Sequence, residues 1–195
     1  KDSTINNLRT LLQVLRANPD SGVVAGGSAP GSLDHIIFAK AAKAAGVDAL
    51  KVRYIPYQGG GEAMAALLGG SASVLSTGAS EVLSQVRAGQ VRVLAIFSEQ
   101  RLGGLFRDVP TAIEQGYNVT FPIWRGFYGP PDMPASAVKF WEEALTRMSK
   151  TKGWDKVLTD TQWFPFVVSG DRFRRFLDED TKNFETLLRE LGFVR

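Results

Sequence analysis

The stretch Val23-Val24-Ala25-Gly26-Gly27-Ser28-Ala29-Pro30-Gly31-Ser32-Leu33-Asp34-His35 decides how this chain is interpreted. A short apolar run, typical of a strand, breaks into small residues and then opens a helical pattern at Ser32. Small residues let a ligand approach the backbone, and a helix N-terminus offers unpaired N–H groups with a partial positive charge. The stretch therefore predicts a site for a carboxylate or phosphate group. The alternative is a tight turn in which Ser32 acts only as the N-cap of the helix.

The composition describes a globular chain of 195 residues, 44% of them hydrophobic, which can bury one large core or two modest ones. The sequence contains no run of 18 apolar residues and therefore predicts no membrane span. With no cysteine and a single histidine, the chain offers no disulfide and no recognisable metal site. The net charge of +3 is spread along the chain, which favours attraction of anions and does not predict nucleic-acid binding.

Strands and helices alternate over the first half of the chain. Apolar runs predict strands at residues 23–25, 50–56, 72–75 and 91–97, and helical spacing predicts helices at residues 5–15, 32–46, 61–68 and 79–87. This alternation indicates right-handed crossovers and a mainly parallel sheet flanked by helices. Ligands of such sheets bind at the carboxyl ends of the strands, and the four loops that leave those ends are rich in glycine, serine, threonine and alanine. The shared position and composition of these loops predict a binding cleft.

The character of the sequence changes after Thr111, where a short helix, an aromatic extended segment (119–127) and a proline-rich linker (129–134) are predicted. Helices at 136–148 and 153–159, a strand at 163–168 and a long amphipathic helix follow. The apolar stripe of that last helix predicts core packing rather than a cofactor site. This part has too little strand for a core of its own, so we expect it to pack on the first domain or on a part of the protein outside this sequence.

Six segments carry a family resemblance by their order and spacing: residues 27–35, 54–61, 88–95, 101, 109–117 and 124–130. Together they cover nearly all of the chain, which resembles the tripartite tricarboxylate transporter substrate-binding proteins, also called the Bug (TctC) family. The resemblance implies an α/β fold of the type II periplasmic-binding-protein class, with two lobes that close on a ligand. Residues 1–122 would form a nearly complete lobe two, and residues 123–195 the returning strand and C-terminal helices of lobe one.

The resemblance also implies a function. The protein would be a periplasmic, non-enzymatic receptor that captures a small mono- or dicarboxylate and delivers it to the membrane permease subunits of the transporter, as a monomer when full-length and without a cofactor. Family members carry a signal peptide and the first strands of lobe one, and this sequence contains neither. The open alternative is the effector-binding domain of a LysR-type transcription regulator. A distant third interpretation is an α/β enzyme that uses Ser28 or Ser76 as its nucleophile.

The predicted ligand-binding residues are small or aromatic residues of the loops at the strand ends, together with one tryptophan of the returning segment. They are Ser28, Ala29, Gly31, Ser32, Tyr57, Gly59, Gly60, Ser76, Thr77, Gly78 and Trp124. The open alternatives are an aromatic that covers the core for Tyr57, a simple turn for Gly59 and Gly60, and a core side chain for Trp124. Ser98 and Arg101 are weaker candidates, because loop arginines are usually solvated or paired.

Two titratable residues follow the glycine-rich loop and raise the question of catalysis. No carboxylate at useful spacing orients His35, and no Gly-x-Ser-x-Gly motif is present, so a structural hydrogen bond is the better prediction for this histidine. Asp34 is expected to complement the helix dipole in the first turn. We therefore predict no catalytic residues.

Overall fold

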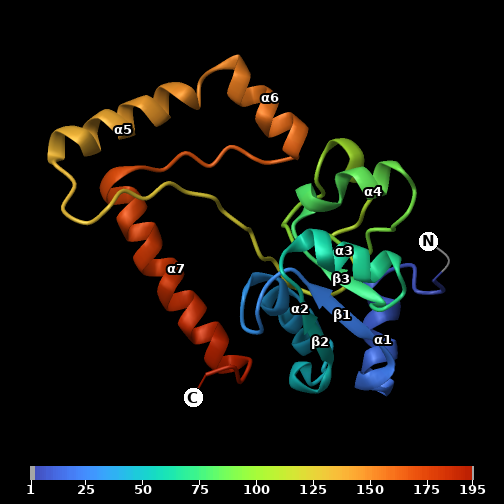
Figure 1. Cartoon of the computed structure of the whole chain (residues 1–195). Coiled ribbons are helices and arrows are strands. Elements are labelled where there is room, and N and C mark those ends of the chain that lie inside the picture. The colour runs from blue at the N-terminus through green and yellow to red at the C-terminus, as the bar shows by residue number, and fades with distance from the viewer. Residues whose placement is uncertain (1–2, 195) are drawn as a thin grey trace. The chain divides into compact units, whose positions relative to one another are not determined.

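A three-stranded parallel sheet organises the first half of the chain in the computed structural model, which describes residues 3–194 (Figure 1). The strands β1 (Val23–Gly26), β2 (Arg53–Pro56) and β3 (Val74–Ser76) are arranged in the order β2-β1-β3. Gly26 at the end of β1 is in register with Pro56 of β2 and with Ser76 of β3. The carboxyl ends of all three strands are therefore level, and the loops that follow them begin at one edge of the sheet.

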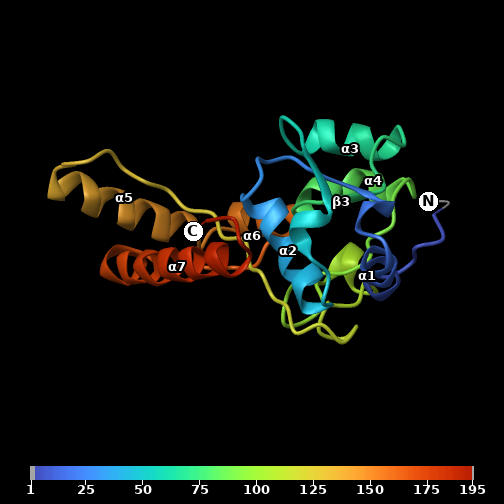
Figure 2. The ribbon, with the colours of Figure 1, turned by 90° about the horizontal axis from the view of Figure 1, so that it is seen from below.

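Helices cover both faces of this sheet. Figure 2 shows α3 (Gly60–Leu68) on one face and α1 (Leu8–Ala17) and α2 (Leu33–Ala44) on the other. Ala25 of β1 is fully buried with Ala63 of α3, and these small side chains allow the helix to approach the sheet closely. The mainly parallel α/β architecture predicted from the sequence is confirmed.

The remaining helices of this part of the chain are short. They are α4 (Leu83–Arg87) and the 3-10 segments η1 (Pro19–Ser21), η2 (Ala49–Lys51), η3 (Ala79–Val82) and η4 (Gly104–Phe106). A second core cluster joins Met64 of α3 to Val82, Leu102 and Phe106, and Phe106 is fully buried within it. Through this cluster, η3 and η4 pack against α3, and this packing fixes the position of the loops that follow β2 and β3.

The strand predicted for residues 91–97 is wrong. Within the described residues, this segment joins a strand partner only through one isolated parallel bridge, between Ile96 and Thr111. Its apolar pattern reflects packing instead, because Val91, Val93 and Ile96 lie against the Phe106 cluster. An apolar pattern indicates burial, but a strand also needs a neighbouring strand whose backbone groups are free to pair. The edge strand β3 is only three residues long and offers few such groups.

The predicted helix after Thr111 is also wrong, since residues 112–116 form turns. The Thr111 backbone N–H donates to the Glu114 carboxylate at 2.7 Å, and the Glu114 N–H donates to the Thr111 hydroxyl at 3.1 Å. The same carboxylate accepts two bonds of 2.9 Å from Arg101 Nε, which is therefore paired. These reciprocal bonds satisfy the local donors without a continuing helix.

The chain forms two compact units by its internal contacts. Unit 1 runs to Pro122 and includes the stretch from Leu187 onward, and unit 2 comprises Ile123–Thr186. The C-terminal stretch is fixed to unit 1 by an ion pair of 3.3 Å between Lys43 and Glu190 and by a ring contact between His35 and Phe193.

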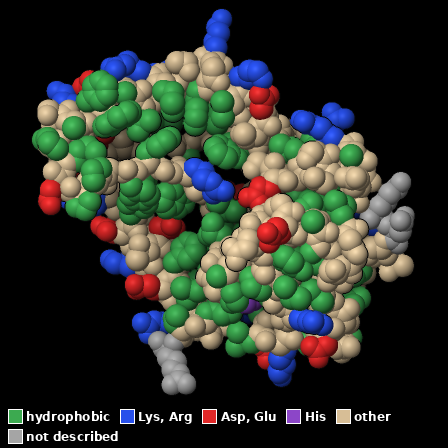
Figure 3. Space-filling model, viewed as in Figure 1, with side chains coloured by type: hydrophobic (Ala, Val, Ile, Leu, Met, Phe, Trp, Pro, Cys, Tyr) green, Lys and Arg blue, Asp and Glu red, His purple; other side chains and the backbone are tan. Residues whose placement is uncertain are grey.

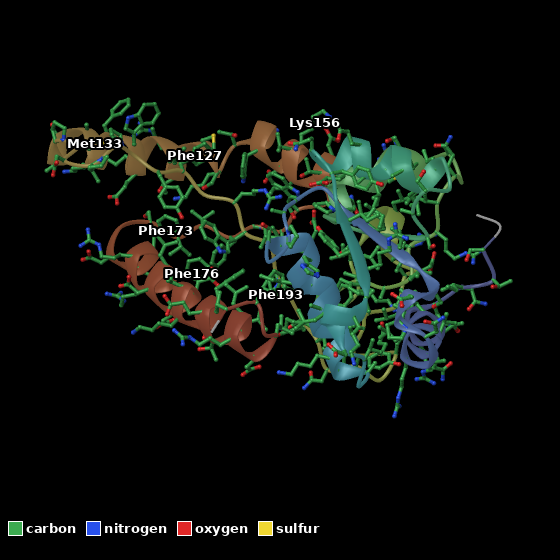
Figure 4. The ribbon with its side chains drawn as sticks, turned by 60° about the horizontal axis from the view of Figure 1, so that its bottom comes forward. Phe127, Met133, Lys156, Phe173, Phe176 and Phe193 are labelled. Atoms are coloured by element: carbon green, nitrogen blue, oxygen red, sulfur yellow. The ribbon has the colours of Figure 1, made fainter. Side chains whose placement is uncertain are left out.

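Unit 2 contains α5 (Ala135–Met148), α6 (Lys152–Thr161) and most of α7 (Gly170–Glu190). The strand predicted for residues 163–168 is wrong, because this segment has no strand partner among the described residues and is simply extended. Phe173 and Phe176 project from one side of α7 toward the extended segment that carries Phe127 (Figure 4).

No residue of unit 2 is buried, although the unit is rich in aromatic residues. Hydrophobic side chains gather on the surface of its helices and extended segments (Figure 3). The most exposed aromatic ones are Phe127, Tyr128, Phe140, Trp141, Phe164 and Phe166, each at 54–69%. The apolar stripe of α7 is only half-buried, so the prediction that it lies in a core is not met within this unit. Among residues 3–194, no helix has both the length and the apolar character needed to cross a bilayer.

Candidate functional site

Three loops meet at the carboxyl edge of the sheet, as the parallel register requires. The Tyr57 N–H donates to the Gly26 carbonyl at 2.9 Å, and the Gly59 N–H donates to the Gly27 carbonyl at 3.1 Å. Gly27 lies so close to the start of α3 that a Cβ atom there would be 2.4 Å from the Gly60 nitrogen. The loops after β1 and β2 are therefore in direct backbone contact, and the loop after β3 begins beside them at Ser76.

The loop after β1 contains a tight turn at Ala29-Pro30-Gly31-Ser32. The Ser32 N–H donates to the Ala29 carbonyl at 3.0 Å, and Gly31 has a φ of +82°. Proline at the second position and a glycine with positive φ at the third are typical of a type II turn. Ser32 is the N-cap residue of α2 by position, but its side chain makes no capping hydrogen bond.

Asp34, in the first turn of α2, organises the glycine-rich loop. Its Oδ2 accepts hydrogen bonds from the Gly27 N–H at 2.9 Å and from the Ser28 hydroxyl at 3.1 Å. Its backbone carbonyl accepts a bond of 2.6 Å from the Ser76 hydroxyl. Asp34 thus does more than complement the helix dipole: it engages the hydroxyl groups of Ser28 and Ser76, which were predicted as ligand donors.

His35 is buried beneath the same loop and has a structural role, as predicted. Its Nδ1 accepts a hydrogen bond of 3.1 Å from the Gly31 N–H, and its ring stacks on Tyr54 with centroids 4.1 Å apart. Burial lowers the pKa of His35, because an apolar environment disfavours the charged imidazolium. The bond from Gly31 requires an unprotonated Nδ1, so the neutral histidine holds the loop.

Tyr54 of β2 is a member of the site that the sequence analysis missed. Its hydroxyl donates a hydrogen bond of 2.8 Å to the Ser28 carbonyl. The same hydroxyl prevents any side chain at residue 26, because a Cβ atom on Gly26 would lie 2.0 Å from the Tyr54 Oη. Burial raises the pKa of Tyr54. The signal available in the sequence was the alternation of β2, which places Tyr54 and Pro56 on one side and Ile55 on the other.

A carboxylate also lies at the start of α3. Glu81 Oε2 accepts a hydrogen bond of 2.6 Å from the Thr77 hydroxyl and lies directly over Gly60. Together with Gly61, Met64 and Gln85, Gly60 and Glu81 line a hollow of about 400 Å³, which we call the α3 hollow. Glu81 was not among the residues predicted from the sequence, because Thr77 precedes the 3-10 segment η3 and its pairing with Glu81 is not a helical i,i+4 contact.

The other predicted site residues take structural positions around these loops. Tyr57 is half-buried and packs on the cluster of Ala25 and Ala63, so the alternative role of covering the core is supported. Gly59, with a φ of +102°, is the N-cap residue of α3, and Gly78 is the N-cap residue of η3.

Several backbone N–H groups remain available at this edge of the sheet, and four of them lie on the loops after β1 and β3. Those of Ser28, Ala29, Thr77 and Gly78 donate to no protein acceptor in the described part of the chain. They belong to the loops after β1 and β3, whose strands end in register. Backbone donors of this kind suit an anionic group of a ligand.

Trp124 belongs to unit 2. Its indole N–H donates to the Asp180 carboxylate at 2.9 Å, and its ring meets Phe173 and Phe176 edge to face, at 5.8 and 5.4 Å. These contacts fit the alternative of a packed tryptophan, and a ligand contact by Trp124 stays a prediction.

Curated relatives match the chain over most or all of its length. A Cupriavidus necator protein described as "UPF0065 protein in gbd 5'region" is 27% identical over 197 residues, which is 100% of this chain and 58% of the relative. Protein BugT of Bordetella pertussis is 27% identical over 143 residues, which is 72% of this chain and 43% of BugT. The chain thus matches 58% of the length of the first relative and 43% of the length of the second.

Solved structures show the same fold. A Rhodopseudomonas palustris protein with adipate superposes with a TM-score of 0.88 at 20% identity, and a malate-bound protein of the same organism with 0.79 at 20%. The periplasmic binding protein BugD gives a TM-score of 0.80 at 22% identity. The matches cover 98%, 95% and 98% of this chain, respectively, and 63% of each solved chain.

The family model described as the tripartite tricarboxylate transporter family receptor matches residues 1–193, nearly the whole chain. The glycine-rich loop, the level strand ends and the fold of the solved neighbours all agree with this match. The chain therefore belongs to the TctC family, the receptors of tripartite tricarboxylate transporters.

Proposed function

We propose that this protein is a solute receptor that binds a small organic carboxylate. The observation that carries the proposal is the set of four unpaired backbone N–H groups, of Ser28, Ala29, Thr77 and Gly78, on two loops that start side by side. An anion bound there needs no basic side chain, because the N–H dipoles supply the complementary charge. Family membership and the adipate and malate held by two solved neighbours support the same ligand class.

The family also supports the cellular role. We infer that the protein works in the periplasm, as the name of its neighbour BugD indicates for that protein, and passes its ligand to membrane permease subunits. We also propose that the protein binds its ligand as a monomer and does not catalyse a reaction. The family match favours this role over an effector-binding domain of a transcription regulator.

We propose the two lobes with the boundary expected from the sequence, residues 1–122 in lobe two and residues 123–195 in lobe one, although the stretch from Leu187 onward packs with unit 1. The exposed aromatic side chains of unit 2 support an incomplete lobe, because a unit without a single buried residue cannot bury enough apolar surface to be stable alone. The relatives, of which this chain spans 58% or less, have the length to complete it.

Calorimetric titration with malate, adipate and the corresponding diamides tests the function. We expect the dicarboxylates to bind and the uncharged diamides to bind at least about tenfold more weakly, since charge-assisted hydrogen bonds are roughly twice as strong as neutral ones. Equal affinity for acids and amides would contradict a carboxylate receptor.

Ser28→Ala tests the site. The Ser28 hydroxyl donates to the Asp34 carboxylate, and without this bond the Asp34 charge should oppose a bound anion more strongly, so affinity should fall about tenfold or more. The control is Ser21→Ala, since Ser21 is exposed and bonds only to the Asn18 carbonyl. Unchanged affinity in Ser28→Ala would contradict a role of the Ser28–Asp34 hydrogen bond in binding, since the backbone N–H of residue 28 is kept.

A further inference from the structure

The α3 hollow carries chemistry that the proposed function does not use. Its walls come from the first turns of α3, at Gly60, Gly61 and Met64, and from the segment of Glu81 and Gln85. It is an open hollow of about 400 Å³. The hollow adjoins the loop of Thr77 and Gly78, because the Thr77 hydroxyl bonds to Glu81.

Glu81 places a negative charge at the N-terminus of α3. Its Oε2 lies so near Gly60 that a Cβ there would be 2.3 Å away, so only glycine admits the carboxylate at this place. The N-cap residue Gly59 provides no side-chain cap, and the partial positive charge of the helix end favours the anion. Thr77 fixes one carboxylate oxygen by its hydrogen bond of 2.6 Å.

In the part of the chain that the structure describes, Glu81 forms no ion pair. Among residues 3–194, no lysine or arginine nitrogen lies within 4.0 Å of Glu81. Gln85 is the other lining residue with a polar side chain, and its uncharged amide offers both a hydrogen-bond donor and an acceptor. A second carboxylate, brought by a ligand to this end of the hollow, would meet an unscreened like charge.

We propose that Glu81 determines the ligand specificity of the receptor: it excludes a ligand carboxylate from the α3 hollow and selects ligands with an ammonium or hydroxyl group there. This inference rests on the proposed function, in which the ligand carboxylate binds the backbone donors of the loops after β1 and β3. The preferred ligand class is then an amino or hydroxy acid, whose donor group bonds to Glu81 while its carboxylate remains at the loops. An unsubstituted dicarboxylate lacks the donor.

Glu81→Gln tests this assignment with four probes: L-aspartate, malate, succinate and ethanolamine. In the wild-type protein we expect aspartate and malate to bind about tenfold or more tightly than succinate, since a hydrogen bond to a charged group is worth that ratio. Glu81→Gln should weaken aspartate about tenfold and strengthen succinate, and so remove the preference. Glu62→Gln is the matched control, because Glu62 carries the same charge in the first turn of α3, is not among the residues that line the hollow, and accepts a bond from the Gln58 N–H. An unchanged ratio of aspartate to succinate affinity in Glu81→Gln overturns the proposal.

The probes also separate this proposal from the proposed function. Binding of ethanolamine that Glu81→Gln abolishes, without binding of any acid, would retain Glu81 as a selector and overturn the carboxylate receptor. Binding of all three acids with no preference for a donor group would retain the receptor and overturn the role of Glu81. Failure of all four probes to bind the wild-type protein would overturn both.

Discussion

Asp34 shows how one side chain determines the conformation of a loop. It accepts hydrogen bonds from the Gly27 N–H and the Ser28 hydroxyl, and its carbonyl accepts one from Ser76. We expect Asp34→Asn to lower the free energy of unfolding by about 1–3 kcal/mol, because a charge-assisted bond is lost and one donor of the pair is left unsatisfied. Urea unfolding measures this change.

The control for this prediction is Asp108→Asn. Asp108 forms an ion pair with its neighbour Arg107, and its side chain is 89% exposed, so its loss should change stability by less than about 0.5 kcal/mol. Equal effects of the two substitutions would mean that Asp34 does not hold the loop.

The buried His35 should make the free energy of unfolding depend on pH. Its burial lowers its pKa in the folded protein below the ordinary value of 6.5, so the unfolded chain binds more protons between these two pKa values. Stability should therefore be fully present above pH 6.5 and fall as the pH decreases toward the lowered pKa of His35. His35 is the only histidine of the chain, so His35→Gln should flatten the profile of unfolding free energy between about pH 7 and pH 5.5. A slope that persists in the variant would assign it to other groups.

The contact between the loop after β1 and the start of α3 governs the site at the scale of elements. At Gly27, a Cβ would lie 2.4 Å from the Gly60 nitrogen and 2.5 Å from the Gly59 carbonyl carbon, and backbone atoms cannot move aside as a flexible side chain can. Gly27→Ala should therefore cost about 1–3 kcal/mol of unfolding free energy, as overpacking of a core does.

Gly61→Ala provides the comparison within α3. A Cβ at Gly61 meets nothing within 4 Å, and alanine favours a helix over glycine, so we expect a gain of about 0.5–1 kcal/mol. Thermal unfolding of the two variants measures the contrast. A stabilised Gly27→Ala would refute the close approach of the two loops.

The whole molecule is uneven in its packing. Unit 1 buries Leu12, Ile36 and Phe106 almost completely, whereas unit 2 buries no residue. Because protection from hydrogen exchange follows buried apolar packing, the amides of α2 should exchange at least about tenfold more slowly than those of α5. Hydrogen exchange followed by mass spectrometry resolves the two helices, and similar rates in both would show that unit 2 is as well packed as unit 1.

The sequence by itself determined the α/β class, the parallel strands β1 to β3 and the family. Each of these depends on local signals: apolar runs, glycines at helix ends and the order of short motifs along the chain. It also located the loops of the site, since parallel strands carry their functional loops at one edge. The structural role of His35 followed from the lack of an orienting carboxylate in the sequence.

Only the tertiary structure decided which donors of the site are engaged. Asp34 binds the Ser28 hydroxyl, and Glu81 binds the Thr77 hydroxyl, and neither pairing follows from the apolar pattern because side-chain hydrogen bonds depend on three-dimensional distance. Residues 91–97 illustrate the same limit for the backbone, because their apolar pattern reports burial against Phe106 and cannot report the absence of a paired neighbour. Burial is encoded locally in a sequence, whereas pairing requires a partner that the fold must bring to the right place.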